Sequence, residues 1–176
     1  SMKDLYFVDG YNIIFAWDPL KKLADESLEH ARQKLIDILT GYGKIKGIEL
    51  VLVFDAMYTD EAAKEEKIGG DCTVVYTDKE ETADSRIERL VYEQRHRRRS
   101  IYVATSDGTE QLQVLGSGAN RVSARELADD VERMKKEASR YRHDNSQLET
   151  GTRNEVVHYV RNSEVWEKLE KIRRSK

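Results

Sequence analysis

The sequence has little cysteine, no long apolar run and no large excess of charge of either sign. Its one cysteine, Cys72, cannot form an internal disulfide, and it lacks the cysteine or closely spaced histidine partners of a structural zinc site. A lone thiol suits a reducing compartment, so we expect a cytoplasmic protein. No stretch approaches the ~20 apolar residues that span a membrane, and no basic region precedes a long apolar run near the start. We therefore expect neither secretion nor membrane insertion.

The formal net charge of -3 argues against a simple polycationic nucleic-acid binder. The charge is nevertheless uneven along the chain. Residues 1–132 carry 18 lysines and arginines against 26 acids, whereas residues 133–176 carry 12 against 7. An acidic body with a basic tail is typical of proteins whose tail contacts phosphate backbones, and a solvated helix surface accounts for the same composition equally well.

Short apolar runs that end on or near an aspartate predict the strands of a buried sheet. Residues 5–8, 50–54 and 101–104 are continuous apolar runs, as expected for strands covered on both faces. Residues 73–76 are a weaker candidate, and residues 120–123 are a candidate edge strand. At 176 residues, the chain has the length of one domain with a sizeable core.

Helical spacing of apolar residues fills the segments between these runs. Residues 28–39 and 81–94 show it clearly, and residues 108–116 and 124–139 add two more predicted helices. Alternating strands and helices indicate βαβ units, hence an α/β fold with a mostly parallel sheet between helices. We expect residues 58–71 to be a mobile excursion between strands. The domain is expected to span residues 2–141, followed by a basic extension over residues 142–176.

The predicted topology brings several carboxylates to one edge of the sheet. The carboxyl ends of parallel strands meet at a common edge, where Asp9, Asp55 and Asp107 follow three of the runs. Asp84 lies in the first turn of the helix predicted over residues 81–94, with Glu81 one turn earlier. Converging carboxylates repel one another unless cations neutralise them, so the cluster predicts a site for Mg²⁺ or Mn²⁺. Two such ions about 4 Å apart hydrolyse phosphodiesters without a protein nucleophile.

Each aspartate also has a purely structural interpretation. Asp9 is placed to cap the segment that follows it, and Asp84 to begin a helix. Asp107 precedes Gly108, as in an Asx-turn. The structural interpretation is the stronger one for any single residue, whereas the four together favour the metal site.

Four short motifs resemble the acidic motifs of NYN domains, a branch of the PIN-like nucleases. Residues 7–12 read Phe-Val-Asp-Gly-Tyr-Asn and are similar to the opening motif of that branch. The later motifs are Val-Phe-Asp-Ala at 53–56, Thr-Ala-Asp at 82–84 with Ile-Glu at 87–88, and Ala-Thr-Ser-Asp at 104–107. Their order and spacing, with the basic tail, are most similar to the bacterial YacP-type NYN proteins.

The resemblance implies a function and a role for each motif residue. It implies a three-layer PIN-like fold and a ribosome-associated endoribonuclease that acts on messenger RNA. By the same resemblance, Asp9, Asp84 and Asp107 would form the metal-facing core, with Asp55 assisting. Asn12 would position a phosphate or a water. Ser106 either bonds a phosphate or a metal-bound water, or caps a helix that begins after Asp107.

The basic tail is the predicted RNA contact. Its cations are interleaved with Tyr141, Tyr159 and Trp166, and aromatic rings can stack on bases. The alternative is a final helix that packs on the body and exposes a charged face. The basic cluster at residues 95–99 should lie at the opposite sheet edge from the aspartates. It follows the predicted helix over residues 81–94, and cations near a helix C-terminus interact favourably with the helix dipole. The candidate RNA-binding residues are Arg140, Arg142, Arg153, Arg161, Lys171, Arg173 and Arg174.

Three other function classes fit parts of this sequence less well. Asp107-Gly108-Thr109 resembles the nucleophile loop of haloacid dehalogenase-type phosphatases, but those enzymes need a second Asp two residues after the nucleophile. Tyr11, Met57 and Thr109 occupy those positions. A nucleotide-binding dehydrogenase is excluded because no Gly-x-Gly-x-x-Gly follows the first strand. A non-catalytic RNA- or ribosome-binding module on the same fold remains the alternative.

Overall fold

The structure is a computed structural model that describes residues 2–106, 118–149 and 171, with the backbone alone over 145–149. Its centre is a six-stranded sheet in the order β3-β4-β2-β1-β5-β6. All neighbouring strands are parallel except β3, which runs antiparallel to β4 at one edge. The strands are β1 (Leu5–Asp9), β2 (Glu49–Phe54), β3 (Lys64–Lys67), β4 (Cys72–Tyr76), β5 (Ile101–Thr105) and β6 (Asn120–Ser123).

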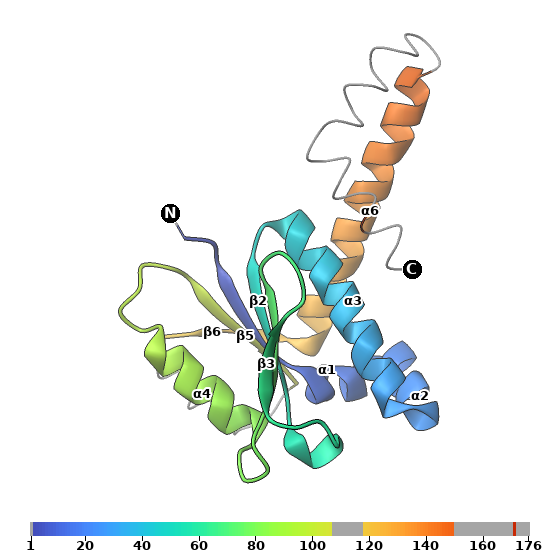
Figure 1. The fold of residues 1–176 in the computed structure, drawn as a ribbon. Helices are drawn as coiled ribbons and strands as arrows, with labels where there is room; N and C mark the ends of the chain where they lie inside the picture. The colour runs from blue at the N-terminus through green and yellow to red at the C-terminus, as the bar shows by residue number, and fades with distance from the viewer. Residues whose placement is uncertain (1, 107–117, 150–170, 172–176) are drawn as a thin grey trace.

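Helices cover both faces of the sheet, so the fold has three layers (Figure 1). One face carries four helices, whereas α4 (Ala83–Glu93) is the described helix that covers the other. The α/β class and the mostly parallel sheet predicted from the sequence are thus confirmed. The four helices on the first face are α1 (Gly10–Ala16), α2 (Asp18–Glu26), α3 (Leu28–Lys46) and α6 (Ala124–Glu149).

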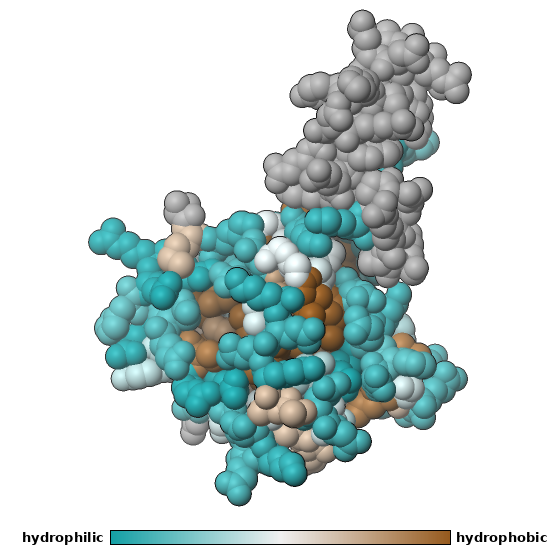
Figure 2. Space-filling model, viewed as in Figure 1, coloured by the Kyte–Doolittle hydropathy of each residue, from teal (hydrophilic) through white to brown (hydrophobic). Residues whose placement is uncertain are grey.

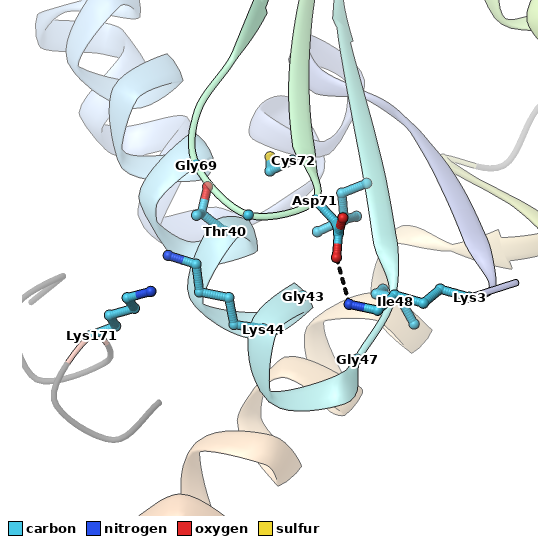
Figure 3. Close-up of a pocket in the computed structure, with 12 residues that line it drawn as sticks. Lys3, Thr40, Gly43, Lys44, Gly47, Ile48, Gly69, Asp71, Cys72 and Lys171 are labelled. Atoms are coloured by element: carbon cyan, nitrogen blue, oxygen red, sulfur yellow. Dashed lines mark hydrogen bonds and ion pairs between the residues drawn. The ribbon is translucent and has the colours of Figure 1, made fainter. Parts of the chain in front are cut away.

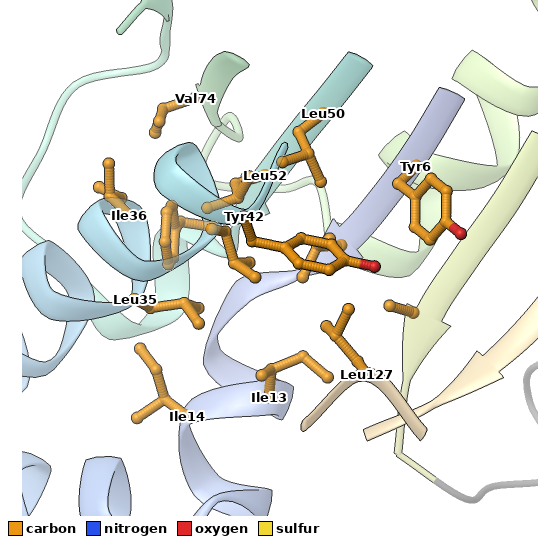
Figure 4. Close-up of a cluster of buried hydrophobic side chains, with 14 of the residues drawn as sticks. Tyr6, Ile13, Ile14, Leu35, Ile36, Tyr42, Leu50, Leu52, Val74 and Leu127 are labelled. Atoms are coloured by element: carbon orange, nitrogen blue, oxygen red, sulfur yellow. The ribbon is translucent and has the colours of Figure 1, made fainter. Parts of the chain in front are cut away.

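The larger core lies between the sheet and these four helices. Val8, Leu52 and Leu127 are fully buried there, and Figure 4 shows side chains from α1, α3, α6 and β2 converging on one another. A second, smaller cluster joins β1, β5 and α4 on the other face. The outer surface in Figure 2 is mostly hydrophilic, with hydrophobic residues showing mainly between α4 and β3 and beside α3. Two buried faces explain why the central strands are continuous apolar runs.

Local sequence signals set several helix ends. The Ser27 hydroxyl accepts a hydrogen bond from the His30 N–H at the start of α3, and Gly47 ends that helix with φ of 74°. Thr82 caps α4, because its hydroxyl accepts from the Ser85 N–H at 3.1 Å. The helix predicted from residue 81 therefore begins at Ala83, which leaves Glu81 outside it.

The structure also differs from the predicted elements in other parts of the chain. The segment over residues 58–71 contains the edge strand β3, whose Lys-Glu-Glu-Lys sequence is exposed throughout and so carries no apolar pattern. Helices α1 and α2 were not predicted. Helix α6 runs to Glu149 rather than to residue 139, so it continues through the boundary expected after Tyr141. The helix predicted over residues 108–116 lies outside the described residues.

None of the helices in the described part of the chain combines the length and the apolar character that crossing a membrane requires.

Candidate active site

Three adjacent strands deliver polar residues to the carboxyl edge of the sheet, at the lower end of Figure 1. Asp9 is the last residue of β1, Asp55 directly follows β2, and Ser106 directly follows β5. In the sheet β1 lies between β2 and β5, with Asp9 in register with Val53 and Val8 in register with Ala104. Asp9 therefore lies between the other two positions.

Asp55 joins the start of α4 to this edge. Its Oδ2 accepts a hydrogen bond from the Ala83 N–H at 3.2 Å, and its Oδ1 accepts from the Met57 N–H at 2.9 Å. Both carboxylate oxygens thus bind backbone amides, and this contact holds the first turn of α4 near the end of β2. The residue after Ala83 is Asp84, so Asp55 positions Asp84 at the carboxyl edge.

Electrostatics show that Asp9 and Asp84 lie close together. Burial and the charge of Asp84, with a smaller contribution from Asp55, raise the pKa of Asp9 to about 7, although a hydrogen bond from the backbone N–H of Asn12 opposes the change. Asp9 occupies the N-cap position of α1, whereas Thr82 rather than Asp84 caps α4. The capping role considered for Asp84 is therefore wrong.

Asn12 connects α1 to the end of β5. Its side-chain oxygen accepts hydrogen bonds from the Ser106 N–H and, at 3.3 Å, from the Thr105 hydroxyl. The residue after Ser106 is Asp107, which lies outside the described residues. The expected contacts of Asn12 and Ser106 with a phosphate or a water stay predictions.

Steric crowding explains why the Asp-Gly-Tyr-Asn motif has glycine at position 10. A Cβ on Gly10 would lie 2.2 Å from the ring of Phe54, which is itself fully buried and cannot move aside. Glycine at this position lets α1 start directly against β2. The close approach of Gly10 to Phe54 therefore helps to position Asp9, before it, and Asn12, two residues after it.

Glu81 is committed to an ion pair. Its carboxylate accepts from Nη2 of Arg86 at 2.6 Å and from Nε at 2.8 Å, and Arg89 lies 3.2 Å away. The hydrogen bond from Arg86 holds the pKa of Glu81 below its usual range. Arg86 is buried and also faces Glu65 of β3, so it anchors α4 to the neighbouring edge strand. Sequence reasoning missed Arg86, because its partners are brought together only by the fold.

The carboxylate oxygens at this edge are the type of ligand that a hard divalent cation prefers. Asp9 is largely buried and faces Asp84 and Asp55, so its ionised form is disfavoured until a cation neutralises the group. Within residues 2–106, 118–149 and 171, no three acidic, histidine or cysteine side chains are arranged around a single possible ion position. The Asp9–Asp84 pair would need a further ligand, and Asp107, the sequence candidate, is outside those residues.

A separate cavity of about 350 Å³ lies at the opposite, amino-terminal edge of the sheet (Figure 3). It is lined by Lys44 at the end of α3, by the Gly69–Gly70 turn and by Lys171. Burial and the charge of Lys171 lower the pKa of Lys44, and Lys44 has no ion pair with any described residue. The cavity is remote from the carboxylates, so it has no part in chemistry at the carboxyl edge.

The predicted RNA-contact residues are only partly described. Arg140 is exposed on α6, Arg142 donates to Ser139 Oγ at 3.2 Å, and Lys171 is exposed beside the cavity. Arg99 donates to the Lys3 carbonyl and to Glu49 at 2.7 Å, at the amino-terminal edge as predicted. The remaining candidates, Arg153, Arg161, Arg173 and Arg174, lie outside the described residues.

Comparison with known proteins gives consistent matches over most of the chain. The model of the YacP-like NYN domain family matches residues 6–174. A Bacillus subtilis protein described as uncharacterized protein YacP is 40% identical over 137 residues, which cover 78% of this chain and 80% of that protein. A crystal structure of Rae1 (YacP) from Bacillus subtilis has a TM-score of 0.73 and 36% identity, covering 97% of this chain and 95% of that chain. A crystal structure of a mutant of that protein has a TM-score of 0.71 and 34% identity, with coverage of 96% and 91%.

Proposed function

Because the chain belongs to the family of YacP-like NYN domains, as its motifs predicted, we propose that it is a divalent-metal-dependent endoribonuclease. Its proposed substrate is RNA, in particular messenger RNA in a ribosome-associated context, and its proposed location is the cytoplasm. The RNA substrate and the ribosome partner rest on the resemblance of the motifs to that family. The metal-dependent chemistry rests on the carboxyl edge of the sheet.

One observation carries the proposal. Asp9 and Asp84 come from different elements, yet the fold brings them close enough for the charge of Asp84 to raise the pKa of Asp9. A fold selected for stability alone gains nothing from two facing carboxylates, since like charges disfavour one another. The same pair becomes favourable once a divalent cation lies between the oxygens.

Each residue at the edge has a separate role in the proposed reaction. Asp9 and Asp84 would hold Mg²⁺ or Mn²⁺, with Asp107 as the further ligand, whereas Asp55 keeps Asp84 in place through the Ala83 amide. Asn12 fixes Ser106, the residue before Asp107, through the Ser106 N–H. A bound divalent ion supplies an activated water and neutralises charge at the scissile phosphate.

The basic tail would supply affinity rather than chemistry. Lys171 lies beside Lys44 at the amino-terminal edge, and these two like charges favour an anion between or near them (Figure 3). A phosphate backbone is the anion that the proposed substrate offers. The electrostatic part of RNA affinity and the cleavage of RNA would therefore depend on opposite edges of the sheet.

Cleavage assays on translated and untranslated RNA test the proposal. Purified protein should cut RNA internally with Mn²⁺ or Mg²⁺, should stop when EDTA is added, and should cut more when the RNA is being translated. A protein that binds RNA or ribosomes equally well with and without metal, and leaves the RNA intact in every condition, would instead be a non-catalytic binding module.

A further inference from the structure

Two exposed aromatic rings lie on the segments that follow Asp9 and Asp55 at the carboxyl edge. Tyr58 belongs to a short 3-10 helix, η1 (Ala56–Tyr58), that directly follows Asp55, and Phe15 belongs to α1, which directly follows Asp9. Each side chain is 40% exposed. Their ring centroids are 5.6 Å apart at an interplanar angle of 71°. The two rings meet edge to face and form one contiguous aromatic surface, here called the Tyr58–Phe15 platform.

The platform is held in place by buried contacts. The Tyr58 ring lies against the buried ring of Tyr11, with centroids 5.2 Å apart, and Tyr11 packs in turn on Phe54. Phe15 is one helical turn after Tyr11 in α1, so it extends the same cluster of aromatic rings to the surface. An aromatic pair fixed in this way loses little conformational freedom when a ligand binds.

The backbone that carries Tyr58 is fixed as well. The Ala56 N–H donates to the Thr77 hydroxyl at 2.9 Å, and Thr77 is buried. One residue beyond Tyr58, the hydroxyl of Thr59 accepts from Arg32 at 3.2 Å. Arg32 is also buried and donates to the Tyr11 hydroxyl at 3.1 Å. These bonds hold η1 on both sides of the ring.

The charges around the platform indicate what kind of ligand it accepts. Asp60 and Glu61 are exposed beside it and would repel a phosphate group. The nearby cations are already engaged. Arg32 donates to Tyr11 and Thr59 and lies 3.8 Å from Glu61, and Lys64 lies 3.2 Å from the same carboxylate. A flat, uncharged group with a π-face is the chemistry that fits, and a nucleobase is such a group.

We propose that the Tyr58–Phe15 platform stacks an unpaired base of the RNA next to the scissile phosphate. This inference rests on the proposed nuclease function and adds a requirement on the substrate. A base inside a duplex is already stacked and paired, whereas an unpaired base can be splayed onto a protein ring. The substrate at the carboxyl edge is therefore single-stranded RNA, bound through a base on the platform while the carboxylates face its backbone.

Fluorescence of 2-aminopurine in a single-stranded RNA oligonucleotide tests the platform. Binding is measured in EDTA, with the 2-aminopurine moved one position at a time along the RNA. At one position the wild-type protein should quench the fluorescence by stacking. Tyr58→Ala should remove that quenching and weaken binding roughly ten- to a hundredfold, the range for loss of one base–aromatic stack. Tyr58→Phe should retain both, because it keeps the ring.

Tyr92→Ala is the matched control. Tyr92 is also an exposed tyrosine, 55% exposed, but it lies at the far end of α4, near Arg95. Its replacement should leave quenching and affinity unchanged, and thermal unfolding should verify that each variant is folded. Equal binding by Tyr58→Ala and Tyr92→Ala, or the absence of a quenched position with wild-type protein, would overturn the platform.

Gel analysis of the same samples separates the two proposals. RNA that is cut in EDTA, or left intact when Mn²⁺ replaces EDTA, contradicts the metal-dependent nuclease. Quenching that depends on Tyr58 in either of those cases still supports the platform. Cleavage that requires Mn²⁺ but is as fast for a fully duplex RNA as for its single-stranded counterpart supports the nuclease and overturns the platform.

Discussion

Replacing Asp84 by Asn should abolish cleavage while leaving the metal-free protein as stable as the wild type or more stable. Asn keeps the shape and the hydrogen-bonding capacity of the side chain but removes the charge that attracts a divalent cation. Asp84 is exposed and is not the cap of α4, so the fold loses no capping bond. The only large electrostatic consequence within the described residues is at Asp9.

The expected change in stability on Asp84→Asn substitution follows from the pKa of Asp9. Its rise from 3.8 to about 7 corresponds to about 4 kcal/mol that disfavours the ionised form in the folded protein. Burial is the largest cause and Asp84 the second, so we expect the Asp84→Asn substitution to recover about 1 kcal/mol. A raised carboxyl pKa leaves stability intact below about pH 4 and lowers it as the pH rises through about 7. The stabilisation by the substitution should therefore be absent below about pH 4 and fully developed at about pH 8.

Urea unfolding in EDTA at about pH 4 and about pH 8 measures the stability difference between the two proteins, and it is repeated at the higher pH with Mn²⁺. RNA cleavage by both proteins is measured in parallel. Mn²⁺ should stabilise the wild type and should do so much less for Asp84→Asn. Glu93→Gln, an exposed carboxyl change at the other end of α4, serves as the control and should alter none of these results. Near-wild-type cleavage by Asp84→Asn, or equal stabilisation of both proteins by Mn²⁺, would remove Asp84 from the metal site.

Three further perturbations test other parts of the structure. Gly10→Ala should lower the free energy of unfolding by about 2 kcal/mol and strongly reduce cleavage, because its Cβ would overlap the buried Phe54 ring; urea unfolding and a cleavage assay measure both. Asp130→Asn should lower the free energy of unfolding by about 2 kcal/mol at about pH 7. Burial alone would raise the pKa of Asp130, but hydrogen bonds, led by that from Lys46, outweigh it and lower this pKa to about 2. That loss should disappear as the pH falls from about 4 to about 2, and a loss that persists at the lower pH would contradict it. Ending the chain after Tyr141 should leave thermal unfolding nearly unchanged, whereas RNA affinity and its dependence on salt should both fall if the tail contacts phosphates.

The central strands were predictable because burial on both faces leaves a direct signal in the sequence. The runs at residues 5–8, 50–54 and 101–104 are apolar throughout and correspond to β1, β2 and β5. Strand β3 leaves no such signal, since it lies at the sheet edge, is antiparallel and exposes all four of its charged residues. Its pairing with β4 is decided by backbone hydrogen bonds, which any sequence can make.

Placement of the aspartates was predictable for the same reason, whereas their partners were not. Parallel strands have their carboxyl ends at one edge, so Asp9 and Asp55 follow from the topology alone. That both oxygens of Asp55 bind amides, one of them 28 residues away at Ala83, depends on how α4 packs on the sheet. The buried guanidinium groups of Arg32 and Arg86 were likewise not foreseen, because in the sequence they resemble ordinary surface cations.

Helix α6 also sets a minimum length for the RNA that can contact the whole protein. It begins at the carboxyl edge, where the Ala124 carbonyl accepts from the Trp17 indole at 2.8 Å, and it runs back past the amino-terminal edge (Figure 1). Its 26 residues span about 39 Å at about 1.5 Å per residue. An RNA held at the end of α6 and cut beside Asp9 must bridge that distance. Oligonucleotides too short to do so would use the catalytic edge without the end of α6, and their cleavage would depend less on salt.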